Sequence, residues 1–101
     1  MSSLENYLAE LSDLSQPLAT SKLANLSELA PEEVDSFDSA WPGIDVERRR
    51  QITGRLVELV EDNLELDFDA VFRSCLADSD SVVRARAAEG LGSAHRCELR
   101  I

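Results

Sequence analysis

Six positions in this chain are matched, 35 residues further on, by residues of the same type or the same apolar character. Each copy of this set begins with a phenylalanine, Phe37 or Phe72, and has an aspartate, Asp45 or Asp80, eight residues further on. The other matched pairs are Trp41 with Leu76, Arg49 with Arg84, Ile52 with Ala87 and Leu56 with Leu91. A repeat of this length is typical of stacked helical hairpins, in which each hairpin packs only on its neighbours.

The second copy contains strong helix signals between residues 76 and 92. Asp80 is predicted to cap a helix, because its carboxylate can accept a hydrogen bond from a backbone N–H one turn on and its charge suits the positive helix end. Val83, Ala87 and Leu91 follow at helical spacing, and the small residues among them let a neighbouring helix approach closely. Gly92 is predicted to end this helix.

A short motif in the same stretch carries a family resemblance. It consists of a leucine, two aspartates, valine–arginine, paired alanines and leucine–glycine, here Leu76, Asp78, Asp80, Val83, Arg84, Ala87, Ala88, Leu91 and Gly92. This pattern is similar to the HEAT repeats of phycobilisome-lyase-like proteins, although Ser81 stands where those repeats often have proline. The resemblance implies that the turn aspartate and the arginine form polar links between stacked repeats. With their counterparts in the first copy, the predicted link residues are Asp45, Arg49, Asp78, Asp80 and Arg84.

The chain is predicted to be all-α, because leucine, alanine, glutamate and arginine are abundant while isoleucine and threonine are few. We expect an α-solenoid (HEAT-like) of about six helices in three antiparallel pairs. The expected parts are a single HEAT-like domain over 1–92, with an irregular N-terminal cap pair over 1–30 whose second helix is near 18–29, a repeat over 31–63, a repeat over 67–92, and a tail over 93–101. The predicted repeat core is Phe37, Trp41, Ile52, Leu56, Phe72, Leu76, Val83, Ala87 and Leu91.

The net charge of −10 is unevenly distributed. Residues 1–45 hold nine acids and one base, whereas residues 46–101 hold eleven acids and nine bases. This balance argues against nucleic acid and anionic membranes as partners, and it leaves two interpretations open, solubility or attraction of a basic partner. The N-terminus lacks a basic segment and no apolar run approaches the length of a membrane span, so neither a signal peptide nor a transmembrane helix is predicted.

Cysteine and histidine are too few to suggest catalysis or a metal centre. Cys75 and Cys97 form no CxxC motif, so we expect no disulfide framework and a reducing, cytoplasmic setting. His95, the single histidine, lies two residues before Cys97, but this pair supplies only part of the tetrahedral ligand set of a structural zinc site. We therefore predict no enzymatic activity, no cofactor and no metal.

Three other groups of residues have structural interpretations. The acids between residues 58 and 69 lack the central glycine of an EF-hand loop, so a solvated acidic edge is expected. Arg48, Arg49 and Arg50 form the only basic run, and we expect them to pair with nearby acids rather than with nucleic acid. Phe37 and Trp41 are four residues apart and are expected in the core rather than in a ligand stack.

These features favour a non-catalytic scaffold or adaptor that binds another protein, with a basic segment as one option for the partner's contact. An alternative, implied by the resemblance alone, is an accessory subunit of a phycobilin-lyase-like enzyme. The nine residues after Gly92 are too few for another hairpin. Since a terminal repeat without a cap leaves an apolar face open, we expect either a homodimer through the C-terminal repeat or a continuation in a longer array.

Overall fold

The computed structural model describes the backbone of residues 3–15, 17–18, 20–63 and 65–99, and the side chains within 4–15, 17–18, 22–63 and 65–92. Within these ranges the chain forms five α-helices and two 3-10 helices, which are α1 (Ser3–Ser12), η1 (Thr20–Leu26), α2 (Pro31–Ala40), η2 (Trp41–Gly43), α3 (Val46–Asp62), α4 (Asp69–Cys75) and α5 (Ser81–Leu99). No strand occurs in the same ranges. The predicted all-α class is confirmed.

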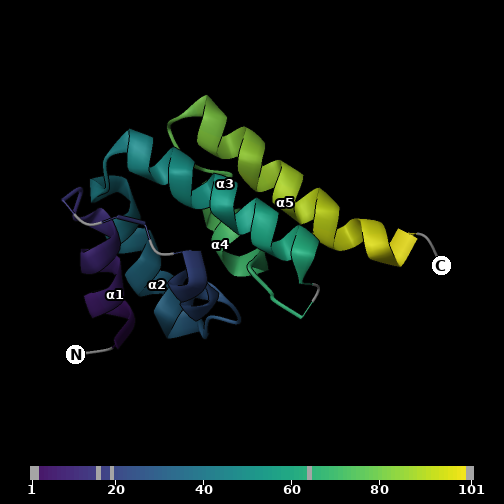
Figure 1. Cartoon of the computed structure of the whole chain (residues 1–101), viewed down its shortest axis with the longest axis horizontal. Coiled ribbons are helices and arrows are strands. Elements are labelled where there is room, and N and C mark those ends of the chain that lie inside the picture. Colours follow the sequence, from purple (N-terminus) through teal and green to yellow (C-terminus); the bar gives the residue numbers. More distant parts are fainter. Residues whose placement is uncertain (1–2, 16, 19, 64, 100–101) are drawn as a thin grey trace.

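The helix contacts fall into two series. In the first series α1 packs against α2, and α2 packs against α4. In the second, η1 contacts α3, and α3 packs extensively against α5. Figure 1 shows α3 and α5 side by side and running in the same direction. Because α4 also packs against α5, the two series meet in one body.

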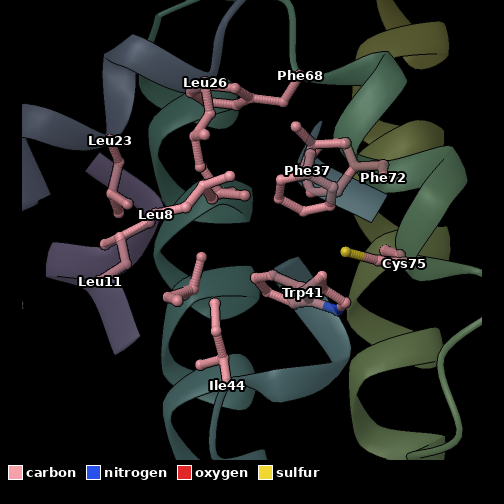
Figure 2. Close-up of a cluster of buried hydrophobic side chains, with 14 of the residues drawn as sticks. Leu8, Leu11, Leu23, Leu26, Phe37, Trp41, Ile44, Phe68, Phe72 and Cys75 are labelled. Atoms are coloured by element: carbon pink, nitrogen blue, oxygen red, sulfur yellow. The ribbon is translucent and has the colours of Figure 1, made fainter. Parts of the chain in front are cut away.

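One apolar cluster lies between these helices (Figure 2). Phe37 of α2 stacks on Trp41 with ring centroids 4.9 Å apart and planes inclined by 23°. Phe68 meets Phe72 of α4 edge to face, with a centroid distance of 6.2 Å and an interplanar angle of 86°. Figure 2 shows the buried thiol of Cys75 pointing toward the aromatic rings. Leucines of α1 and η1 complete the cluster on the other side: Leu8, Leu11, Leu23 and Leu26.

An aspartate caps the start of each of the helices α3 and α5, as predicted for Asp80. At the start of α3, Asp45 Oδ2 accepts the backbone N–H of Glu47 at 3.0 Å. At the start of α5, Asp80 Oδ2 accepts the backbone N–H of Val83 at 3.1 Å. These carboxylates satisfy N–H groups that the first helical turn leaves without a partner, and they face the positive end of the helix dipole. Asn63 follows the last residue of α3, at the end of the repeat predicted over 31–63.

Two segments differ from the prediction. Residues 20–26 form a 3-10 helix rather than an α-helix. Three residues per turn place Leu23 and Leu26 on the same side, and both are fully buried. The helix α5 continues through Gly92 to Leu99, so residues 93–99 belong to a helix and not to a tail, while residues 100–101 lie outside the described part. A single glycine costs only about 1 kcal/mol in a helix, and the residues after it favour the helical state.

Candidate functional site

The most densely hydrogen-bonded group in the described chain surrounds Asp78, in the turn between α4 and α5. The Asp78 side chain is fully shielded from solvent. Its Oδ2 accepts hydrogen bonds from Trp41 Nε1 at 2.7 Å and from Arg49 Nη1 at 2.8 Å. Its Oδ1 accepts the backbone N–H of Asp80 at 2.8 Å. One carboxylate therefore joins the end of α2, the helix α3 and the start of α5.

A second carboxylate next to it makes a two-point contact. Asp80 accepts from Arg50 Nε through Oδ2 at 3.0 Å and from Arg50 Nη2 through Oδ1 at 2.7 Å. This fork-to-carboxylate geometry gives stronger and more directional binding than a single hydrogen bond. The hydrogen bonds from Arg50 lower the pKa of Asp80 to about 2, and the backbone N–H of Val83 contributes to the same shift. Asp80 is thus a charged helix cap and an anchor for α3 at the same time.

Two arginines of α5 complete the junction by binding backbone carbonyl groups. Arg84 Nη1 donates to the carbonyl oxygen of Asp78 at 2.8 Å. Arg86 Nη1 donates to the carbonyl oxygen of Arg50 on α3. Its guanidinium lies so close to Gly54 that a Cβ there would come within 2.9 Å of Nη1. The absence of a side chain at Gly54 lets Arg86 reach the α3 backbone.

The structure brings together four of the predicted link residues, which are Arg49, Asp78, Asp80 and Arg84. Asp78 pairs with Arg49, but the arginine bound to Asp80 is Arg50 and not Arg84. Arg84 contacts a carbonyl in its own hairpin rather than linking two hairpins. Asp45 acts as a helix cap, and in the described chain no arginine hydrogen bond to it is found.

Sequence reasoning missed the contributions of Arg50, Arg86 and the Trp41 indole. The predicted pairing of Arg50 with a nearby acid is found with Glu47 at 3.0 Å, but its stronger partner lies 30 residues away. The contact of Trp41 could have been predicted from the sequence, because a buried indole N–H needs a hydrogen-bond acceptor and an aspartate carboxylate is a good one. Nothing in the repeat match points to Arg86.

Most of the predicted repeat core is buried. The buried members are Phe37, Trp41, Ile52, Leu56, Phe72, Val83 and Ala87. Leu91 is half-buried and packs against the edge of the core. Leu76 is 41% exposed and is a correction to the predicted core. It follows the last residue of α4, and no described element covers that side of the helix.

The chemistry of this junction is that of positioning rather than reaction. The oxygens of Asp78 and Asp80 accept hydrogen bonds from arginine, indole and backbone donors. A general base or nucleophile must instead be free to accept a proton or attack a substrate. The paired charges hold α3 against the α4–α5 turn, so we describe the junction as a structural link.

Other basic side chains are also engaged within the molecule. Arg48 is buried and donates from Nη2 to the backbone carbonyl of Asp13 at 3.0 Å. Lys22 pairs with Glu10 at 3.1 Å. The positive charges in the described chain are therefore largely used in intramolecular contacts.

The surface between α3 and α5 carries more acidic than basic side chains, although Arg55 and Arg86 also line it. A depression of about 380 Å³ lies along the two helices, and Glu58, Glu61 and Glu89 are exposed in its lining. Arg55 contacts Glu58 at a distance of 3.4 Å, while Glu61 and Glu89 face solvent. We call this depression the α3–α5 groove. It lies between two helices of the second series, and its lining has more acids than bases. Asp62 and Glu65, at the acidic edge predicted from the sequence, are exposed just beyond its end.

Few reactive or metal-binding groups occur among the described side chains. The described residues contain no cluster of three or more side chains able to hold a metal ion. Cys75 is a buried free thiol, and burial raises its pKa, with a further contribution from the Asp78 carboxylate. His95 and Cys97 lie in α5, but their side chains are outside the described ones.

No protein-family model matches this sequence, and comparison with curated proteins and with solved structures finds no match. Across the described residues, every helix is too short or too polar to cross a lipid bilayer.

Proposed function

We propose that this chain is a non-catalytic, HEAT-like scaffold built from stacked helical hairpins. The pairs are α1 with η1, α2 with α3 and α4 with α5, which makes six helices in three pairs. Two features support this arrangement. First helices pack on first helices, as in α1–α2 and α2–α4, and second helices pack on second helices, as in η1–α3 and α3–α5. The Arg49–Asp78 and Arg50–Asp80 contacts both join α3 of one proposed hairpin to the α4–α5 turn of the next.

The partner is a basic segment of another protein, bound in the α3–α5 groove. The proposal rests on a difference between the basic and the acidic side chains in the described chain. Most of the described basic side chains are engaged in intramolecular contacts, whereas Glu61 and Glu89 remain exposed along the groove. The whole chain has a net charge of −10. These carboxylates and the overall negative charge attract cations from a distance and favour fast association. The proposed setting is the cytoplasm, in keeping with the free thiol of Cys75.

Titration with a short peptide rich in lysine and arginine, followed by calorimetry over a series of salt concentrations, tests this function. We expect binding that weakens as salt rises, because the contacts are exposed charge pairs. The double substitution Glu61→Gln and Glu89→Gln removes two carboxylates from the groove. It should weaken binding by roughly five- to thirtyfold, since each exposed pair contributes up to about 1 kcal/mol.

The matched control removes the same charge from a different face. Glu32→Gln with Asp35→Asn changes two exposed acids of α2, which belongs to the first helices. Affinity equal to that of the unchanged protein is expected for this control. An equal loss with both double variants would mean that net charge alone attracts the peptide. Binding indifferent to salt would contradict the proposed contact altogether.

A further inference from the structure

The outer face of the α4–α5 hairpin matches a face that is buried one hairpin earlier. Trp41 is 4% exposed, whereas Leu76, its counterpart 35 residues later, is 41% exposed. On the second helices, Thr53 of α3 is fully buried, and its counterpart Ala88 of α5 is exposed. On the α2–α3 hairpin, the corresponding face packs against α4 and α5. The same face of α4–α5 is uncovered in the described chain.

The polar part of that face is also repeated. Arg49 reaches from α3 to the turn aspartate of the next hairpin, Asp78. Arg84 occupies the matching position on α5 and is exposed. Its Nη1 binds the Asp78 carbonyl oxygen, and a guanidinium has further N–H donors for a second acceptor. Arg73 of α4 is exposed as well, so this end of the molecule carries positive charge on its surface.

The opposite end of the molecule offers a complementary turn. Asp13 follows α1 and is exposed. Its Oδ1 accepts the backbone N–H of Ser15 at 3.0 Å, just as Asp78 Oδ1 accepts the backbone N–H of Asp80 at 2.8 Å. Both turns therefore present an aspartate held by the residue two positions later. The other oxygen of Asp78, Oδ2, accepts a hydrogen bond from Arg49 of the preceding hairpin. Asp13 lies in a strongly acidic part of the chain, because residues 1–45 contain nine acids and one base.

We propose that a second copy of this chain docks on the outer α4–α5 face through its α1–η1 end. Arg84 of one protomer binds Asp13 of its partner, and Leu76 is covered by the partner's first helices. This inference rests on the hairpin stacking proposed above and is independent of the basic-peptide site. A twofold dimer through the same face would instead bring together two faces that each carry the exposed Arg73 and Arg84, and two positively charged faces repel each other. Head-to-tail contact leaves both ends available, so the assembly grows with concentration rather than stopping at a dimer.

Sedimentation equilibrium of the full chain over a wide concentration range measures this association. We expect an average mass that rises above the monomer with concentration and falls back at high salt. Arg84→Glu and Asp13→Arg should each weaken association at least about tenfold, because each places like charges at the contact. An equimolar mixture of the two variants should regain it, because the carboxylate introduced in one variant then meets the guanidinium introduced in the other. Leu76→Glu should also weaken association, with unchanged helix content by circular dichroism because the site is exposed.

Asp62→Arg is the control, since it reverses an exposed charge at the last residue of α3, whereas Asp13 and Asp78 contact the first turn of that helix. It should leave the association constant within about twofold, because screened charges outside the contact contribute little. A monomer at all concentrations would overturn the proposal, and so would stronger association of Arg84→Glu alone or a mixture that fails to regain association. If the monomer persists while loss of Asp78 still destabilises the fold, the hairpin stacking stands and only the self-association fails.

Discussion

Arg49 and Asp78 are 29 positions apart in the sequence, yet Arg49 Nη1 lies 2.8 Å from Asp78 Oδ2. The Asp78 side chain has no solvent exposure, and the Arg49 side chain is 11% exposed. Water screens such a pair poorly, and removing one member leaves the other charge buried without a counter-ion. This contact holds the α4–α5 turn on α3 together with the neighbouring Arg50–Asp80 pair.

Asp78→Ala should lower the free energy of unfolding by about 3–5 kcal/mol, because it leaves both Arg49 and the Trp41 indole without their acceptor. Urea unfolding followed by circular dichroism measures the loss. Glu58→Ala is the comparison, since it removes an exposed partner 3.4 Å from Arg55. That change should cost at most about 1 kcal/mol, and equal losses for the two variants would argue against a special role for Asp78.

The Arg50–Asp80 contact predicts loss of stability in acid. The folded-state pKa of Asp80 is about 2, below its ordinary value of 3.8, chiefly because of the hydrogen bonds from Arg50. The stabilisation is therefore complete above pH 3.8 and disappears as pH falls toward 2. Asp80→Asn should flatten the dependence of the free energy of unfolding on pH within this window. Arg50→Met, which removes the two donors and keeps the Asp80 carboxylate, should flatten the same slope.

Gly90 and Gly92 of the same helix should respond to alanine in opposite ways. A Cβ at Gly90 would overlap the ring of Phe72, whereas a Cβ at Gly92 would meet nothing within 4 Å. We expect Gly90→Ala to destabilise the protein by about 1–3 kcal/mol through overpacking. Gly92→Ala should stabilise it by up to about 1 kcal/mol through helix propensity. Thermal unfolding of both variants decides the point, and stabilisation by both would show that α4 and α5 are less closely packed.

Tyr7 should ionise only in strong alkali. It is buried in α1, and burial together with the charge of Glu10 raises its pKa to about 12 from the usual 10.0. Because the folded state disfavours the phenolate, stability is complete below pH 10 and falls as pH rises toward 12. Tyr7 is the only tyrosine, so phenolate absorbance reports it directly. Titration with a midpoint near 10 in the folded protein would contradict this burial.

The sequence predicts a residue's role correctly where that role depends only on its own side chain and its neighbours in the chain. Asp80 caps a helix in any context, and Phe37 and Phe72 are apolar enough to be buried in nearly any arrangement, so these assignments need no coordinates. The choice between Arg49 and Arg50 as the partner of a distant carboxylate depends on the rotation of α3 about its axis, which the repeat pattern does not fix.

Leu76 shows a second reason for a wrong prediction. The repeat match places it in the core because its counterpart Trp41 is covered. Burial, however, requires a neighbour as well as an apolar side chain, and the described chain supplies no further hairpin on that side. A pattern within one hairpin therefore predicts which face is apolar, but not whether that face is occupied.

The position of Trp41 gives the protein an internal fluorophore at the junction of two hairpins. It is the single tryptophan, and its indole N–H donates to the shielded carboxylate of Asp78 across that junction. Any separation of α4–α5 from α2–α3 would expose the ring to water and shift its emission to longer wavelengths. Partial opening of the stack can therefore be followed optically, without a label and at concentrations far below those needed for structural methods.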